Sequence, residues 1–178
     1  LAECPNCTAG YYCPYAATID NPTACPAGSY CPEGSEQPIA CPAGHYCPAG
    51  SADKVACPGG TYLPSTQATS SGACITCPVG YYCPEGSSAT TVCPAGRYCG
   101  TGAAIGTYCA NGTYGTTEGM TEQSDCTDCP EKKFCHTGAI QGYCQAGYFC
   151  QGGSDSATPT VDLSAYLDSM LTQKYVLL

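Results

Sequence analysis

The sequence predicts a small disulfide-rich repeat protein: an elongated stack of short β-ribbons and turns with little regular secondary structure. Three observations support this. Cysteine accounts for 19 of 178 residues, above the roughly 8–10% that is typical of a disulfide scaffold. A Cys-Pro-x-Gly-x-Tyr motif recurs nine times along the chain, and such a short period is typical of stacked repeats. Trp is absent and Phe appears twice, so cross-links must replace a large apolar core.

Each repeat begins with a cysteine, and an aromatic residue follows five positions later in every copy. Glycine stands three positions after the cysteine in eight copies, and proline directly after it in six. Proline restricts φ and glycine accepts positive φ, so the motif predicts a chain reversal. Lys132 replaces the glycine in the eighth copy, which predicts a different turn there. The first cysteines are Cys7, Cys25, Cys41, Cys57, Cys77, Cys93, Cys109, Cys129 and Cys144.

Seven repeats have a second cysteine directly after the aromatic residue. The two others, which begin at Cys57 and Cys109, instead run on to Cys74 and Cys126, and each of these opens a Cys-x-x-Cys pair. The spacing predicts a repeat region over residues 1–150, in blocks of about 4–74, 74–126 and 126–150. The second cysteines of the seven repeats are Cys13, Cys31, Cys47, Cys83, Cys99, Cys135 and Cys150.

The composition changes after Cys150. Gly, Ser, Thr and Pro over residues 151–160 predict a linker. Apolar residues at helical spacing over 161–178 predict a short helix or extended tail that docks, either on the chain's own repeats or on a second subunit. A continuation into a further domain or anchor is the third interpretation. The apolar positions of this tail are Leu163, Tyr166, Leu167, Met170, Leu171, Val176, Leu177 and Leu178.

Charge and motif content argue against several function classes. The net charge is −9 with five basic residues, which disfavours nucleic-acid binding. No apolar run approaches the ~20 residues of a membrane-spanning helix. His45 and His136 lack the partners of a catalytic arrangement, and the cysteine pairs suit disulfides better than a zinc site. We therefore expect no enzyme activity, no catalytic or cofactor-binding residue, and no bound metal.

Two long repeats carry a family resemblance. Cys57-Pro-Gly-Gly-Thr-Tyr62 followed by Cys74-x-x-Cys77, and Cys109-Ala-Asn-Gly-Thr-Tyr114 followed by Cys126-x-x-Cys129, resemble the ephrin-receptor-like cysteine-rich repeat. The pattern is also similar to the first half of the tumour-necrosis-factor-receptor cysteine modules, of growth-factor-receptor type. The resemblance covers residues 4–150 and implies a rod-like extracellular stalk. The extra cysteine after the tyrosine departs from the receptor modules and counts against a receptor-type ligand site.

Two disulfide schemes fit the cysteine spacing, since connectivity does not follow from sequence alone. In the first, which we favour, each Cys-x5-Cys closes on itself, and the resemblance implies that the long repeats close as Cys57–Cys74 and Cys109–Cys126. Cys4 is then unpaired or bonded between molecules. In the second scheme the later cysteine of each repeat reaches the next repeat, the Cys-x-x-Cys pairs close locally, and Cys150 is left over.

The cysteine content predicts an extracellular or cell-surface protein made through the secretory pathway. Leu1-Ala2-Glu3 runs directly into Cys4, as expected of a mature or excised segment. Asn111-Gly112-Thr113 and Asn6-Cys7-Thr8 are N-glycosylation sequons, so covalent glycans are the expected modification.

Two functional hypotheses remain. The first is a self-assembling, glycosylated structural protein whose repeats form a rod-like subunit of a fibril, surface coat or appendage, with copies of itself as the main partner. The second is a ligand-binding stalk or ectodomain fragment of a surface receptor or adhesin, with other extracellular proteins as partners. The irregular segment 131–141 is the sequence feature that supports the second hypothesis. A secreted inhibitor fits poorly, because that class usually has one compact module.

Overall fold

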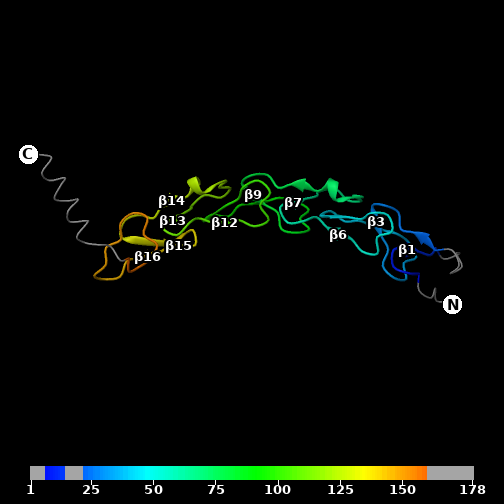
Figure 1. Cartoon of the computed structure of the whole chain (residues 1–178), viewed down its shortest axis with the longest axis horizontal. Helices are drawn as coiled ribbons and strands as arrows, with labels where there is room; N and C mark the ends of the chain where they lie inside the picture. The colour runs from blue at the N-terminus through cyan, green and yellow to red at the C-terminus, as the bar shows by residue number, and fades with distance from the viewer. Residues whose placement is uncertain (1–6, 15–21, 160–178) are drawn as a thin grey trace, which may run out of the picture. The chain divides into compact units, whose positions relative to one another are not determined.

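The computed structural model describes residues 7–14 and 22–159. They form eight antiparallel two-stranded ribbons, and the turn of one repeat leads into the first strand of each (Figure 1). Cys4, Asn6 and the predicted tail lie outside the described residues. The ribbons pair β1 (Tyr11–Tyr12) with β2 (Thr23–Ala24), β3 (Ser29–Tyr30) with β4 (Ile39–Ala40), β5 (His45–Tyr46) with β6 (Val55–Ala56), β7 (Thr61–Tyr62) with β8 (Ile75–Thr76), β9 (Tyr81–Tyr82) with β10 (Thr91–Val92), β11 (Arg97–Tyr98) with β12 (Thr107–Tyr108), β13 (Thr113–Tyr114) with β14 (Thr127–Asp128), and β15 (Lys133–His136) with β16 (Ala139–Tyr143).

This architecture confirms the predicted class, a small disulfide-rich repeat protein of short β-ribbons. Two short 3-10 helices, η1 (Ser71–Ala73) and η2 (Gln123–Asp125), lie in the two long repeats. In the part of the chain that the structure describes, no helix is long and apolar enough to span a membrane. The repeats are numbered 1 to 9 below in chain order.

The turn of each repeat follows from the predicted proline and glycine. In repeat 2 the Ser29 N–H donates to the carbonyl oxygen of Pro26 at 3.1 Å, and Gly28 between them has φ +84°. A positive φ at the third turn position is the requirement of a type II turn, which glycine meets without steric cost. The turn leads into the first strand, and the second strand returns beside it.

Consecutive repeats are joined by three main-chain hydrogen bonds. The residues at the turn-glycine and second-cysteine positions of one repeat donate to the next repeat, and the third residue of the next repeat's second turn donates back to the first cysteine. These donors are glycine and cysteine except for Lys132, Leu63 and Gln67. The same three positions are bonded between repeats 1–2, 2–3, 3–4, 4–5, 5–6 and 8–9. No side chain takes part. Between repeats 2 and 3 the bonds run from Gly28 to Cys47 (2.8 Å), from Cys31 to Ser51 (2.9 Å) and from Gly50 to Cys25 (2.8 Å).

The turn glycine of a repeat also lies against the second turn of the repeat two positions further on. A Cβ on Gly10 would lie 2.6 Å from the carbonyl oxygen of Gly50, and a Cβ on Gly28 would lie 2.7 Å from that of Gln67. Real Cβ atoms essentially never come so close to main-chain oxygen, so these turns require glycine. The same approach joins Gly44 to Gly86, Gly60 to Gly102, Gly96 to Gly138 and Gly112 to Gly153.

The prediction of a different turn at Lys132 is wrong. Lys132 adopts φ +68°, and the Lys133 N–H donates to the Pro130 carbonyl oxygen at 3.2 Å, as in the glycine turns. A non-glycine residue tolerates this conformation at a cost of about 1–2 kcal/mol. Among the described residues no repeat lies two positions beyond repeat 8, so the close approach to a second-next repeat that requires glycine in earlier turns does not arise there. Gly147 of repeat 9 likewise has open space around its Cβ position.

The core of the stack is its disulfides. Cysteines dominate the buried apolar residues, with exposures of 0–7%. Nine disulfides form among the described residues, and they are the pairs of the first scheme. This density of disulfides is characteristic of extracellular or secreted proteins. The pairs are Cys7–Cys13, Cys25–Cys31, Cys41–Cys47, Cys57–Cys74, Cys77–Cys83, Cys93–Cys99, Cys109–Cys126, Cys129–Cys135 and Cys144–Cys150.

Two apolar side chains complete the core of the repeats that lack a second cysteine. In repeat 4, Leu63 occupies that cysteine's position, is 2% exposed, and makes the main-chain bonds that the cysteine makes elsewhere. In repeat 7 the position is Gly115, and the side chain of Met120 (4% exposed) lies where a Cβ of residue 115 would be. In each long repeat, an apolar side chain therefore fills the space that the second cysteine occupies in the short repeats.

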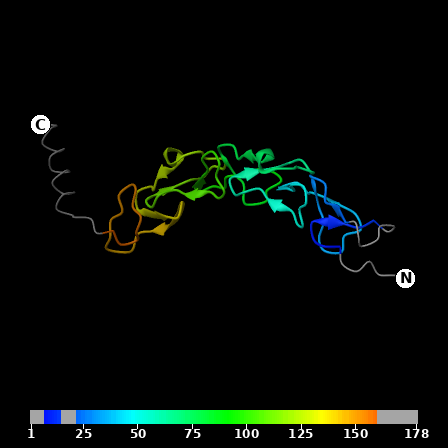
Figure 2. The same ribbon diagram turned by 45° about the vertical axis from the view of Figure 1, so that its right-hand side comes forward.

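The described residues divide into two compact units. The N-terminal unit comprises the chain up to Cys93 and Cys99–Gly106, and the C-terminal unit comprises Pro94–Tyr98 and the chain from Thr107. The predicted blocks of about 4–74, 74–126 and 126–150 group the repeats by their cysteine spacing and stay a prediction. Main-chain bonds continue across residue 74, between repeats 4 and 5, and across residue 126, between repeats 7 and 8. Within each unit, consecutive repeats lie side by side (Figure 2).

The prediction of a linker from residue 151 is wrong for its described part. Residues 151–154 form the second turn of repeat 9, closed by the Ser154 N–H on the Gln151 carbonyl oxygen at 3.2 Å. This turn makes two of the three bonds between repeats 8 and 9, and the Gln145 N–H donates to the Ala157 carbonyl oxygen at 3.0 Å. The glycines of this segment therefore serve a turn, not a flexible connection.

Candidate functional site

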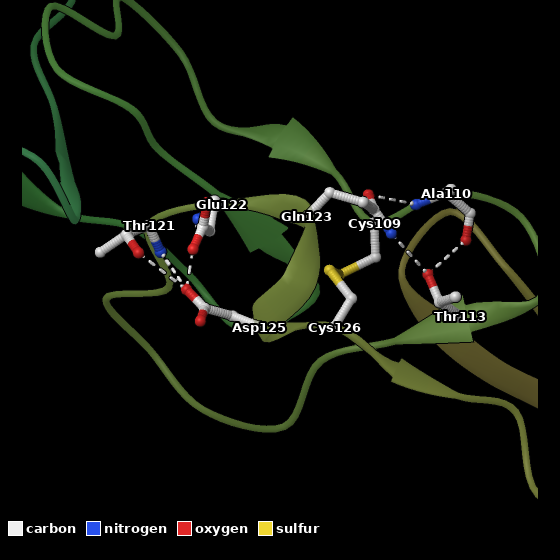
Figure 3. Close-up of a disulfide and its surroundings, with 8 residues drawn as sticks. All are labelled: Cys109, Ala110, Thr113, Thr121, Glu122, Gln123, Asp125 and Cys126. Carbon is white, nitrogen blue, oxygen red and sulfur yellow. Dashed lines mark hydrogen bonds between the residues drawn. A yellow bond between two sulfur atoms is a disulfide. The ribbon is translucent and has the colours of Figure 1, made fainter.

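The candidate site lies in repeat 7, where the predicted glycosylation sequon is next to a loop with many side-chain hydrogen bonds. The Cys109–Cys126 disulfide joins residues 17 positions apart and brings η2 against the turn before β13 (Figure 3). That turn contains the sequon Asn111-Gly112-Thr113. The sequon and η2 thus form one local structure.

The sequon adopts the ordinary turn of a repeat. The carbonyl oxygen of Ala110 accepts the Thr113 N–H at 2.9 Å and the Thr113 hydroxyl at 2.6 Å. Gly112 has φ +82°, and Asn111 lies exposed at the second position of the turn. The asparagine side chain therefore stands on the surface while its two neighbours hold the backbone.

Gln123 of η2 fastens the loop to this turn. Its Oε1 accepts the Ala110 N–H at 3.0 Å, and its Nε2 donates to the Thr113 hydroxyl at 3.2 Å (Figure 3). Six repeats have proline at the position of Ala110, and proline has no N–H to satisfy. Ala110 leaves a donor that needs an acceptor, and the Gln123 side chain supplies it.

Asp125 orders the start of η2. Its carboxylate accepts the Thr121 N–H at 2.7 Å, the Thr121 hydroxyl at 2.9 Å and the Glu122 N–H at 3.2 Å. The bond from the Thr121 main chain, followed by those from the Thr121 hydroxyl and the Glu122 main chain, lowers the pKa of Asp125 below its ordinary value of 3.8. Hydrogen bonds to an ionised carboxylate favour the charged form.

This geometry predicts that acid loosens the loop. Because the pKa of Asp125 is lower in the folded state, the carboxylate's contribution to stability is present above pH 3.8 and is lost as the pH falls through the lower folded-state pKa. An NMR titration of the Thr121 amide should give a midpoint below 3.8 in the wild type and no transition in Asp125→Asn. Asp128→Asn, a nearby exposed carboxylate, serves as the control. A Thr121 midpoint at or above 3.8 would contradict the assignment.

The β15–β16 hairpin is a second candidate site. Its strands are longer than those of the other described ribbons, and the register shifts between Phe134 and Cys135. Tyr143 at its end is 74% exposed, and the Lys133 ammonium lies 5.4 Å from the centre of its ring. An exposed aromatic ring beside a cation is a common feature of protein-binding surfaces.

The remaining predicted residues are distributed along the stack. His45 lies within 3.2 Å of the Ala43 carbonyl oxygen through Nδ1, and His136 is exposed on β15. Over residues 7–14 and 22–159, no three His, Cys, Asp or Glu residues are grouped as metal ligands would be. Gln123 is a site residue that the sequence did not single out, although the absence of proline at residue 110 left a main-chain donor that required a partner.

Comparison of the sequence with protein-family models and with curated proteins gives no match.

Proposed function

We propose that this chain is a structural protein of the extracellular space that reaches it through the secretory pathway and builds a fibril, surface coat or appendage from copies of itself. The observation that carries the proposal is the main-chain interface between repeats. The same three hydrogen bonds, made without a side chain, recur between the repeats of the N-terminal unit and again between repeats 8 and 9, and a disulfide lies at every repeat. Such a design suits mechanical and proteolytic resistance.

The resemblance to ephrin-receptor-like repeats supports the same proposal, since it implies an extracellular stalk. Cysteine and an aromatic residue hold fixed positions in every repeat, and glycine holds its position in all but one. A fold built on turns and disulfides in this way does not depend on a metal, a cofactor or a small ligand. The apolar segment 161–178 is the proposed joint between copies, because a one-sided apolar contact between unlike surfaces propagates when it does not close.

Electron microscopy of the unreduced full-length protein tests the proposal. Regular filaments or sheets are expected, and deletion of residues 161–178 should abolish them. By the helical spacing of the sequence, Leu167→Asp places a charge on the predicted apolar face of the tail and should also prevent assembly, whereas Thr172→Asp, on the opposite face of that pattern, should not. Undiminished assembly of the deletion variant would refute the role of the tail, and isolated particles at all concentrations would refute the assembly itself.

A second candidate function is a ligand-binding stalk or ectodomain segment of a surface receptor or adhesin. The β15–β16 hairpin favours it, because Tyr143 and Lys133 form an exposed surface on the described ribbon that departs most from the repeat. Isolated particles that bind an extracellular protein, and lose that binding in Tyr143→Ala, would favour this candidate over the structural one.

A further inference from the structure

We propose that Asn111 is an N-linked glycosylation site and accepts its oligosaccharide from a lipid-pyrophosphate donor. The inference goes beyond the structural role and shares with it only passage through the secretory pathway. In the transfer, the side-chain nitrogen of Asn111 forms a bond to the anomeric carbon of the sugar and loses one proton. The bond from that carbon to the pyrophosphate oxygen breaks, and the lipid pyrophosphate leaves.

The position of Asn111 in the repeat is suited to a large attachment. The equivalent turn position is exposed in repeats of both compact units, as at Ala27, Val79, Ala95 and Ala146. Val79 shows that a branched side chain is accommodated there at 49% exposure. Asn111 is itself exposed, so a group attached to its side chain extends into solvent and leaves the main-chain bonds between repeats intact.

The next residue has the opposite environment. Gly112 faces the carbonyl oxygen of Gly153, two repeats further on, so closely that a Cβ would collide with it. The sequon thus combines a middle residue that must be small with an asparagine that is free to carry bulk. Because Gly112 is not proline, the sequon also meets the sequence requirement of the transfer.

In the folded loop, the Thr113 hydroxyl, which the sequon requires, is already engaged in hydrogen bonds. Thr113 donates this hydroxyl to the Ala110 carbonyl oxygen and receives the Gln123 amide. The sequon requires Ser or Thr at this position, so the transferring enzyme reads the hydroxyl. The transfer therefore precedes docking of η2, and docking is secured by the Cys109–Cys126 disulfide.

Mass spectrometry of the full chain secreted from a eukaryotic cell tests the site. Enzymatic release of N-glycans in heavy-oxygen water should convert Asn111 to labelled aspartate and remove a glycan mass from the protein. Asn111→Gln and Thr113→Val should lack that glycan, whereas Thr113→Ser should retain it. Asn6→Gln, at the other sequon, should leave the Asn111 peptide unchanged. Secreted protein with bare Asn111 and the same mass as Asn111→Gln would overturn the proposal.

The order of events is tested by synthesis in the presence of a membrane-permeant thiol reductant, which delays closure of Cys109–Cys126. Occupancy of Asn111 should stay the same or rise, and a fall would contradict transfer before docking. The same preparations are examined by electron microscopy. Filaments from secreted protein with bare Asn111 would overturn this inference and leave the structural role standing, whereas a glycan on isolated particles would do the reverse.

Discussion

Replacement of Gly44 by alanine should lower the stability of the N-terminal unit by about 2–5 kcal/mol. The alanine would adopt φ near +80°, at a cost of about 1–2 kcal/mol. Its Cβ would also meet the carbonyl oxygen of Gly86, a main-chain atom that the next-but-one repeat holds in place. Displacement of well-packed neighbours costs about 1–3 kcal/mol more. Denaturant unfolding followed by tyrosine fluorescence measures the effect.

Gly147→Ala is the matched control for this prediction. Gly147 has the same place in the same turn and φ +91°, but its Cβ position is open. The variant should therefore lose about 1–2 kcal/mol, the cost of the backbone conformation alone. If both variants lost the same free energy of unfolding, the contact between the added Cβ and the repeat two positions further on would have no effect on stability.

Removal of the Cys57–Cys74 disulfide by a double change to alanine should cost about 3 kcal/mol, because the bond restrains a long loop in the unfolded chain. The bond spans 17 positions, and the loop it closes carries η1. We expect a lower denaturant midpoint and protease cleavage within residues 64–73. The double change removes both thiols and so avoids disulfide exchange through a remaining cysteine.

Cys25→Ala/Cys31→Ala provides the comparison, since that bond spans 6 positions in the same compact unit. The shorter loop should lower the loss by about 1 kcal/mol. Both cysteines of this pair are nearly inaccessible, so the packing loss is at least as large as in the long repeat. A greater loss for the short loop than for the long one would show that burial, not chain restraint, dominates the contribution of these bonds.

Much of the fold was predictable because the repeat is local. The turn depends on proline and glycine within four residues, and each short disulfide closes within the same repeat. The Cys57–Cys74 and Cys109–Cys126 pairs needed the family resemblance, since spacing alone allowed a second scheme. The main-chain bonds between consecutive repeats, and the close contacts between next-but-one repeats, join residues that are far apart in sequence. The repeat motif therefore did not predict them.

The misses have physical reasons. Leu63 and Met120 fill the sites of absent cysteines, and Met120 does so from outside the motif, where periodicity gives no signal. The linker prediction over residues 151–160 is wrong in its described part because turn-forming and flexible segments share glycine and serine. At the candidate site, the sequon motif identified Asn111. No motif identifies Gln123, because its contact with Thr113, ten residues away, forms only when the 3-10 helix folds.

The spacing between a turn glycine and the repeat two positions further on has a consequence for how such arrays change in evolution. A turn that a later repeat approaches must keep glycine, whereas Lys132 sits in a turn that no described repeat approaches. Duplication of repeats downstream of Lys132 would place a carbonyl against its side chain, while duplication upstream would meet glycine at each new contact. In an array of this kind, a non-glycine residue in the turn is therefore expected where no repeat two positions further on approaches that turn.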